Sequence, residues 1–148
     1  MVRDRQSLND ILYFCTLIEF IARKTNLSRK EVIDYFTLED ISNELQDADI
    51  NHCNSFEEVS DETIARYGIK ASNDLSGNND SAPSFLKIGF VYKNLVSDIA
   101  DSDTIAKTIK DVFSSFISEE ISNYDSDIYF ASSDYLKICF LEGKLIDY

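Results

Sequence analysis

The sequence has few of the residues that build tight turns. Its 148 residues include only four glycines and one proline. Turns between strands draw heavily on glycine and proline, which supply positive φ angles and fixed bends. Their scarcity argues against a turn-rich β protein and predicts long helices joined by short connections. The apolar fraction of 44% is near the globular norm, so we expect a folded chain rather than a disordered one.

Residue types that carry catalysis or bind metals are also scarce. The chain has one histidine, His52, and three widely spaced cysteines, Cys15, Cys53 and Cys139, with no CxxC pair. No HExxH motif, EF-hand loop or glycine-rich phosphate loop is present. We therefore predict no metal ion, no cofactor and no catalytic residue. The odd cysteine count fits a reducing compartment, and we expect a cytoplasmic location.

Long apolar runs are missing, and acidic residues far outnumber basic ones. No segment approaches the ~18 uninterrupted apolar residues of a membrane-spanning helix. The net charge is −13, and residues 1–70 hold 8 basic and 14 acidic residues, against 6 and 13 in residues 71–148. Both halves therefore repel phosphate, and we predict no direct binding to nucleic acid or membrane. A basic protein is the expected partner. The alternative is that the charge only maintains solubility.

Apolar residues recur at helical spacing over most of the chain, which predicts an all-α protein. Ser28 and Glu31 form an S-x-x-E capping box, the clearest start of a helix in the sequence. Gly89 interrupts an apolar stripe and suggests a close helix crossing. A short extended segment is expected at residues 128–130. Helices are expected over residues 8–24, 28–36, 37–45, 55–67, 85–99, 105–121 and 133–142.

Residues 70–84 are expected to form a polar linker. They contain the only proline, one of the four glycines and almost no large apolar side chain. The sequence thus predicts an N-terminal helical subdomain over residues 1–69 and a C-terminal one over residues 85–148. Whether the two halves pack against each other stays open.

Aromatic residues are numerous, with eight tyrosines and ten phenylalanines. Exposed tyrosines beside carboxylates are typical of protein interfaces, and a homodimer is a further assembly that such a surface permits. The alternative is tyrosines with buried rings and solvated hydroxyls. The residues predicted to bind a partner are Tyr124, Asp125, Asp127, Tyr129, Tyr135, Glu119, Glu120 and His52.

Residues 11–22 form an aliphatic helix pattern with an internal glutamate, Glu19, and residues 27–36 follow with a Leu-Ser-x-Lys-Glu-Val helix start. This arrangement resembles an uncharacterised family of short helical bacterial proteins, often encoded beside ADP-ribosyltransferase-like toxins. The resemblance covers at most residues 8–69 and implies an antitoxin or accessory role. His52 matches a histidine of that family, whereas residues 85–148 match nothing in it.

Three functions are therefore compatible with the sequence. The first is a non-enzymatic antitoxin or inhibitor that neutralises a basic partner, in particular a cognate toxin. The alternative is an acidic, phage-type mimic of nucleic acid that blocks a DNA- or RNA-binding enzyme. The second alternative is an enzyme that uses His52, although its neighbour Cys53 is a poor partner because adjacent side chains rarely face each other.

Overall fold

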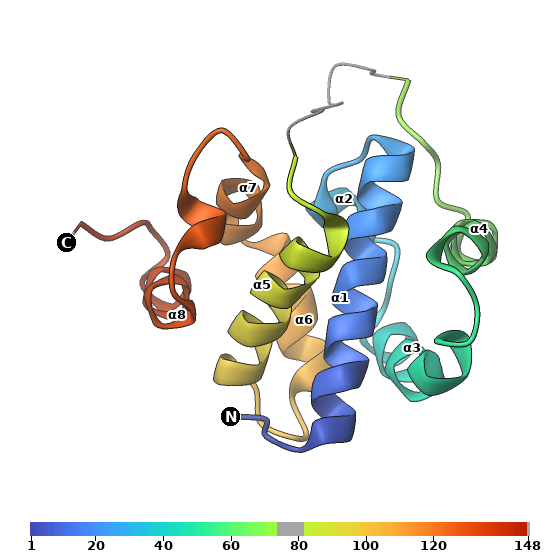
Figure 1. Cartoon of the computed structure of the whole chain (residues 1–148), viewed down its shortest axis with the longest axis horizontal. Coiled ribbons are helices and arrows are strands. Elements are labelled where there is room, and N and C mark those ends of the chain that lie inside the picture. The colour runs from blue at the N-terminus through green and yellow to red at the C-terminus, as the bar shows by residue number, and fades with distance from the viewer. Residues whose placement is uncertain (74–81, 148) are drawn as a thin grey trace.

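The computed structural model describes residues 1–73 and 82–147 (Figure 1). These residues contain helices and no strand, so the all-α prediction is confirmed. The elements in chain order are α1 (Arg5–Thr25), α2 (Arg29–Ile33), α3 (Leu38–Asn51), α4 (Phe56–Tyr67), α5 (Phe85–Ile99), α6 (Ile105–Ser114), α7 (Phe116–Ser122), the 3-10 helix η1 (Ile128–Phe130) and α8 (Ser133–Glu142).

Side-chain caps start most of these helices. The capping box of Ser28 and Glu31 opens α2 as predicted, and Thr37 with Asp40 forms a second box at α3. The start of α1 differs from the sequence-based expectation, because the carboxylate of Asp4 accepts the backbone N–H of Ser7 at 2.9 Å. The helix therefore begins at Arg5, before the expected start at residue 8.

Three predicted elements are corrected by the structure, the first being the helix expected over residues 37–45, which continues to Asn51 as α3. Residues 105–121 form two helices, because Ser115 adopts an extended backbone with φ −87° and ψ 168°. Its hydroxyl donates to the carbonyl of Val112 at 2.7 Å, a local bond that competes with helix continuation. Residues 128–130 are a 3-10 helix rather than an extended segment, since the N–H of Phe130 donates to the carbonyl of Asp127.

Helices α1 and α5 run antiparallel and lie side by side at the centre of the molecule (Figure 1). One hydrophobic cluster includes buried side chains from both sides of residues 70–84, such as Leu17 and Ile18 from α1 and Tyr92 and Leu95 from α5. The two halves therefore pack against each other and share a core. Most of the expected linker, residues 74–81, falls outside the described residues.

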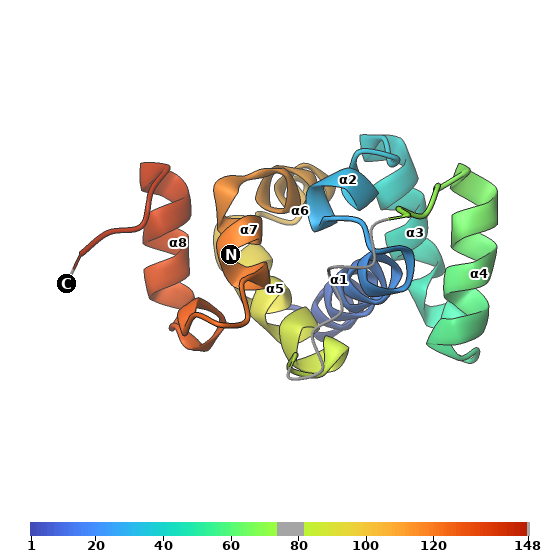
Figure 2. The same cartoon turned by 90° about the horizontal axis from the view of Figure 1, so that it is seen from above.

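The remaining helices surround this pair (Figure 2). Helices α3 and α4 lie together at one end, and α8 lies at the opposite end. Within the described residues, every helix falls short of the length or the apolarity that crossing a membrane requires.

Gly89 is the contact point of the central pair, as its place in the sequence suggested. A Cβ at this position would lie 2.0 Å from Oγ1 and 3.0 Å from Cβ of Thr16 in α1. We expect Gly89→Ala to lower the free energy of unfolding by about 1–3 kcal/mol through overpacking, measured by urea denaturation. The double variant with Thr16→Ala should lose less than the sum of the two single variants. Additive losses would contradict the contact.

Candidate functional site

Negative charge is concentrated in α3 and α4. Residues 38–67 hold nine acidic residues and one basic residue, Arg66, for a net charge of −8. Residues 1–37 hold six basic and five acidic residues, a net charge of +1. Since α3 and α4 lie together at one end of the molecule (Figure 2), the carboxylates gather there. We call this surface the acidic end.

Most carboxylates of the acidic end face solvent. Lys24 of α1 forms ion pairs with Glu57 at 2.5 Å and Asp61 at 2.6 Å. Asp47, Glu58 and Glu62 form no ion pair with any described residue. The exposed members are Glu39, Asp47, Asp49, Glu57, Glu58, Asp61 and Glu62. The surface therefore keeps an uncompensated negative potential that extends into solvent.

A buried carboxylate joins the two helices of the acidic end. Glu44 of α3 is 5% exposed, and its Oε1 accepts the hydroxyl of Tyr67 at 2.7 Å and Nη1 of Arg66 at 3.1 Å, both from α4. Burial raises the pKa of Tyr67, and the hydrogen bond to Glu44 adds to this rise. The tyrosine thus stays a donor at neutral pH, and the bonds hold α3 and α4 in a defined relative position.

A second buried carboxylate, Glu19, lies in α1. The Glu19 side chain has no exposed surface, and it pairs with Arg23 at 2.7 Å and with Arg29, whose Nε donates at 2.8 Å. The hydroxyl of Tyr124, which follows α7, donates to the same carboxylate at 2.5 Å. We call these four residues the Glu19 cluster. It joins α1, α2 and the chain after α7.

The Glu19 cluster remains ionised at neutral pH. Burial alone raises the pKa of Glu19, but the hydrogen bonds and charge of Arg29, with Tyr124 and Arg23, outweigh burial and hold this pKa below its usual range. Burial raises the pKa of Tyr124 to about 12, helped by the negative charge of Glu19. The tyrosine hydroxyl is therefore protonated and able to donate.

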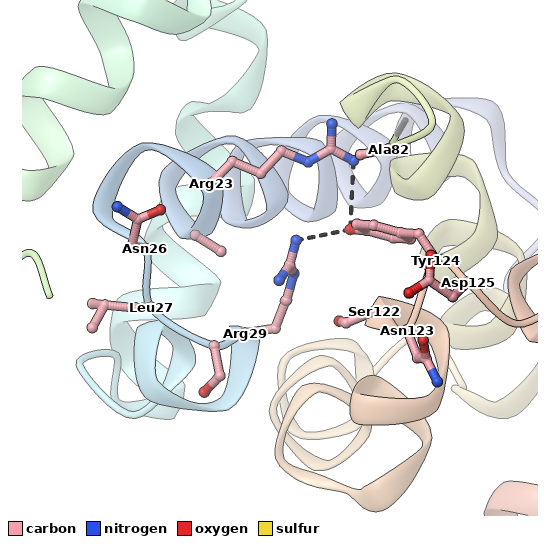
Figure 3. Close-up of a pocket in the computed structure, with 11 residues that line it drawn as sticks. Arg23, Asn26, Leu27, Arg29, Ala82, Ser122, Asn123, Tyr124 and Asp125 are labelled. Atoms are coloured by element: carbon pink, nitrogen blue, oxygen red, sulfur yellow. Dashed lines mark hydrogen bonds between the residues drawn. The ribbon is translucent and has the colours of Figure 1, made fainter. Parts of the chain in front are cut away.

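A cavity of about 410 Å³ opens beside this cluster (Figure 3). Arg23 and Arg29 reach toward the hydroxyl of Tyr124 from opposite walls, and Nη2 of Arg29 donates to it at 2.8 Å. Ala22, Leu27 and Ala82 supply apolar wall, whereas the other lining residues are polar. These are Asn26, Ser28, Ser122, Asn123 and Asp125. The structure thus combines two guanidinium groups with a small, partly apolar enclosure.

The structure brings together only some of the predicted partner-binding residues. Tyr124 and Asp125 line the cavity, and Glu119 lines an adjoining hollow of about 260 Å³ that shares Arg29 with it. The ring of Tyr129 contacts that of Tyr124 at 6.0 Å between centroids. Three others lie outside both hollows: Asp127 precedes η1, Glu120 is half-buried in α7, and Tyr135 of α8 donates to the carbonyl of Ile146.

His52 lies far from that group, at the end of α3. It lines an open hollow of about 690 Å³, and its ring centroid is 5.3 Å from that of Tyr13. Cys53 also lines this hollow and is exposed, whereas Cys15 and Cys139 are buried. Burial raises the pKa of the Cys15 thiol, which opposes nucleophilic use. Within residues 1–73 and 82–147, no three His, Cys, Asp or Glu side chains cluster closely enough to hold a metal ion.

Sequence reasoning missed Glu19, Arg23 and Arg29 as site residues. A signal was present, because Glu19 stands between Ile18 and Phe20 in an apolar run and has an arginine four residues later. An acidic residue in a buried stripe needs a partner. The concentration of charge in residues 38–67 was missed because the charge was counted over each half of the chain rather than over each helix.

Removal of the Glu19 charge should destabilise the protein strongly. We expect Glu19→Gln to lower the free energy of unfolding by about 3 kcal/mol, since two arginines lose their carboxylate in a buried site. Asp111→Asn is the matched control, because it breaks another (i, i+4) pair, with Lys107, on the surface. Its loss should stay below about 1 kcal/mol in the same urea titration. Equal losses of unfolding free energy in Glu19→Gln and Asp111→Asn would contradict a larger contribution from the buried pair.

The free energy of unfolding should also depend on pH through the ionisation of Glu19. Because the pKa of Glu19 is depressed in the folded state, its contribution is present above the unfolded pKa and is lost as pH falls through the folded pKa. The difference in unfolding free energy between the wild type and Glu19→Gln should thus be constant at neutral pH and shrink below about pH 4. A difference that stays unchanged down to about pH 3 would contradict the depressed pKa.

Comparisons with known proteins do not place the chain in a family. No protein-family model matches it, and neither a search of curated proteins nor a search of solved structures returns a match. The resemblance of residues 8–69 to a toxin-associated family therefore stays a prediction. Function has to be inferred from the acidic end, the Glu19 cluster and the cavity beside it.

Proposed function

We propose that the protein is a non-enzymatic binding module whose acidic end captures a basic surface of a partner protein. The observation that carries this proposal is the net charge of −8 over residues 38–67, with seven exposed carboxylates on two adjacent helices. Such a surface attracts a positively charged protein and speeds its association.

The arrangement of the carboxylates supports recognition rather than solubility alone. A solubilising charge has no need to gather at one end, yet residues 1–37 carry a net charge of +1 while residues 38–67 carry −8. The bonds of Glu44 to Arg66 and Tyr67 also order the two helices before any partner arrives. A preordered surface loses less conformational entropy on binding.

The partner that fits best is a toxin with a basic functional surface, which the acidic end would cover. The resemblance to the toxin-associated family covers at most residues 8–69, and the motifs that carry it, residues 11–22 and 27–36, directly precede the acidic end. The role is then that of an antitoxin or inhibitor, which acts by steric and electrostatic blocking and needs no catalytic group.

Charge position can be tested separately from total charge. We expect the triple variant Asp47→Asn, Glu58→Gln, Glu62→Gln to bind a decalysine peptide about tenfold more weakly than the wild type in isothermal titration calorimetry at low salt. The control triple Asp103→Asn, Asp127→Asn, Glu142→Gln removes the same number of exposed carboxylates elsewhere. It should bind within about twofold of the wild type, because its acidic end is intact.

Equal weakening by both triples would show that only net charge matters and would contradict the proposal. The partner class is tested by co-expression and co-purification with the product of the neighbouring gene. A complex that the acidic-end triple disrupts and the control triple retains supports the antitoxin role. Competition by this protein for a nucleic-acid-binding enzyme, with no complex with the neighbouring product, favours the nucleic-acid mimic instead.

A further inference from the structure

We propose that the cavity beside the Glu19 cluster binds a small organic oxyanion, a carboxylate or a phosphate monoester with a short carbon body. This site is independent of the acidic end and of the partner proposed for it. It lies between α1, α2 and the chain after α7 (Figure 3).

The first argument is charge. The Glu19 cluster contains two guanidinium groups and one carboxylate, so it carries a net charge of +1 on partly buried side chains, while the carboxylate of Asp125, which lines the same cavity, is exposed to solvent. The side chains of Arg29 and Arg23 are 13% and 28% exposed, and arginine does not deprotonate in proteins. An unbalanced charge of this kind favours an anion. This local excess is opposite in sign to the net charge of the chain, −13.

The second argument is the supply of hydrogen-bond donors. A guanidinium group has five N–H donors. The bonds of Arg29 to Glu19 and Tyr124 use its Nε and Nη2, and those of Arg23 use the same two nitrogens. Nη1 of each arginine donates to no described residue. Asn123 and Ser122 also line the cavity and add polar groups to it. Donors from two arginines suit the oxygens of a carboxylate or phosphate.

The third argument is the shape of the enclosure. A volume of about 410 Å³ is within the range of small-molecule sites. Ala22, Leu27 and Ala82 can contact a short carbon body while the anionic head meets the arginines. The carboxylate of Asp125, which is exposed and lines the cavity, disfavours a large polyanion such as a nucleic acid. The cavity therefore selects a compact ligand with one anionic group.

The probes are benzoate, phenyl phosphate and inorganic phosphate, each titrated into the full-length protein and followed by ¹H–¹⁵N NMR. We expect saturable shifts at the amides of Arg29, Asn123 and Tyr124 with a dissociation constant on the order of 1 mM. Comparison of benzoate with phenyl phosphate identifies the preferred head group. Weaker binding of inorganic phosphate than of phenyl phosphate shows that the carbon body contributes.

Variants test the arginine contribution. Arg23→Gln leaves the Glu19–Arg29 pair in place but removes the excess charge, and it should weaken binding at least about fivefold. Lys107→Gln, which removes another (i, i+4) cation on α6, should bind like the wild type.

Should Arg23→Gln fail to fold, Asn123→Asp replaces it as the test, because it places a negative charge at an exposed position that lines the cavity and should weaken binding of an anion. Asn43→Asp, on α3, is its control.

Shifts that do not saturate, or that map to residues away from the cavity, overturn the proposal. Equal affinity in Arg23→Gln and Lys107→Gln, or in Asn123→Asp and Asn43→Asp, does so as well. Because Arg23→Gln, Lys107→Gln and Asn123→Asp leave every residue of α3 and α4 unchanged, failure here leaves the decalysine experiment unaffected, and the two proposals can fail separately.

Discussion

The fold depends on how the buried charge of Glu19 is neutralised. A carboxylate with no exposed surface is tolerated in the α1 helix only because Arg23, Arg29 and Tyr124 surround it. These partners come from α1, α2 and the chain after α7, so the requirement for charge neutralisation orients segments far apart in the sequence. The same requirement places two arginines at the wall of a cavity.

Charge is separated along the chain in a way that the net value conceals. The first 37 residues are slightly positive, and the next 30 carry most of the negative charge of the first half. Glu44 and Glu19 play parallel roles in this arrangement, since each is a buried carboxylate that an arginine and a tyrosine satisfy across elements. One joins the two helices of the acidic end, and the other joins α1, α2 and the chain after α7.

Local sequence signals were reliable where the physics is local. The capping box of Ser28 and Glu31 needs only four residues, and it starts α2 as expected. The break at Ser115 was missed because periodic apolar residues on both sides bury equally well in one straight helix or in two. The 3-10 turn at residues 128–130 was mistaken for an extended segment, since three apolar residues in a row have no period that distinguishes the two.

By itself, the sequence determined the helical class, the cap at Ser28, the surplus of carboxylates and the tight contact suggested by Gly89. Each of these follows from composition or from residues within about one helical turn. Only the tertiary structure decided that both halves share one core. It also decided that Arg29 and Tyr124, which lie 95 residues apart in the sequence, both contact Glu19. Sequence spacing carries no distance information over that range, because the meeting of such side chains is set by how whole helices pack.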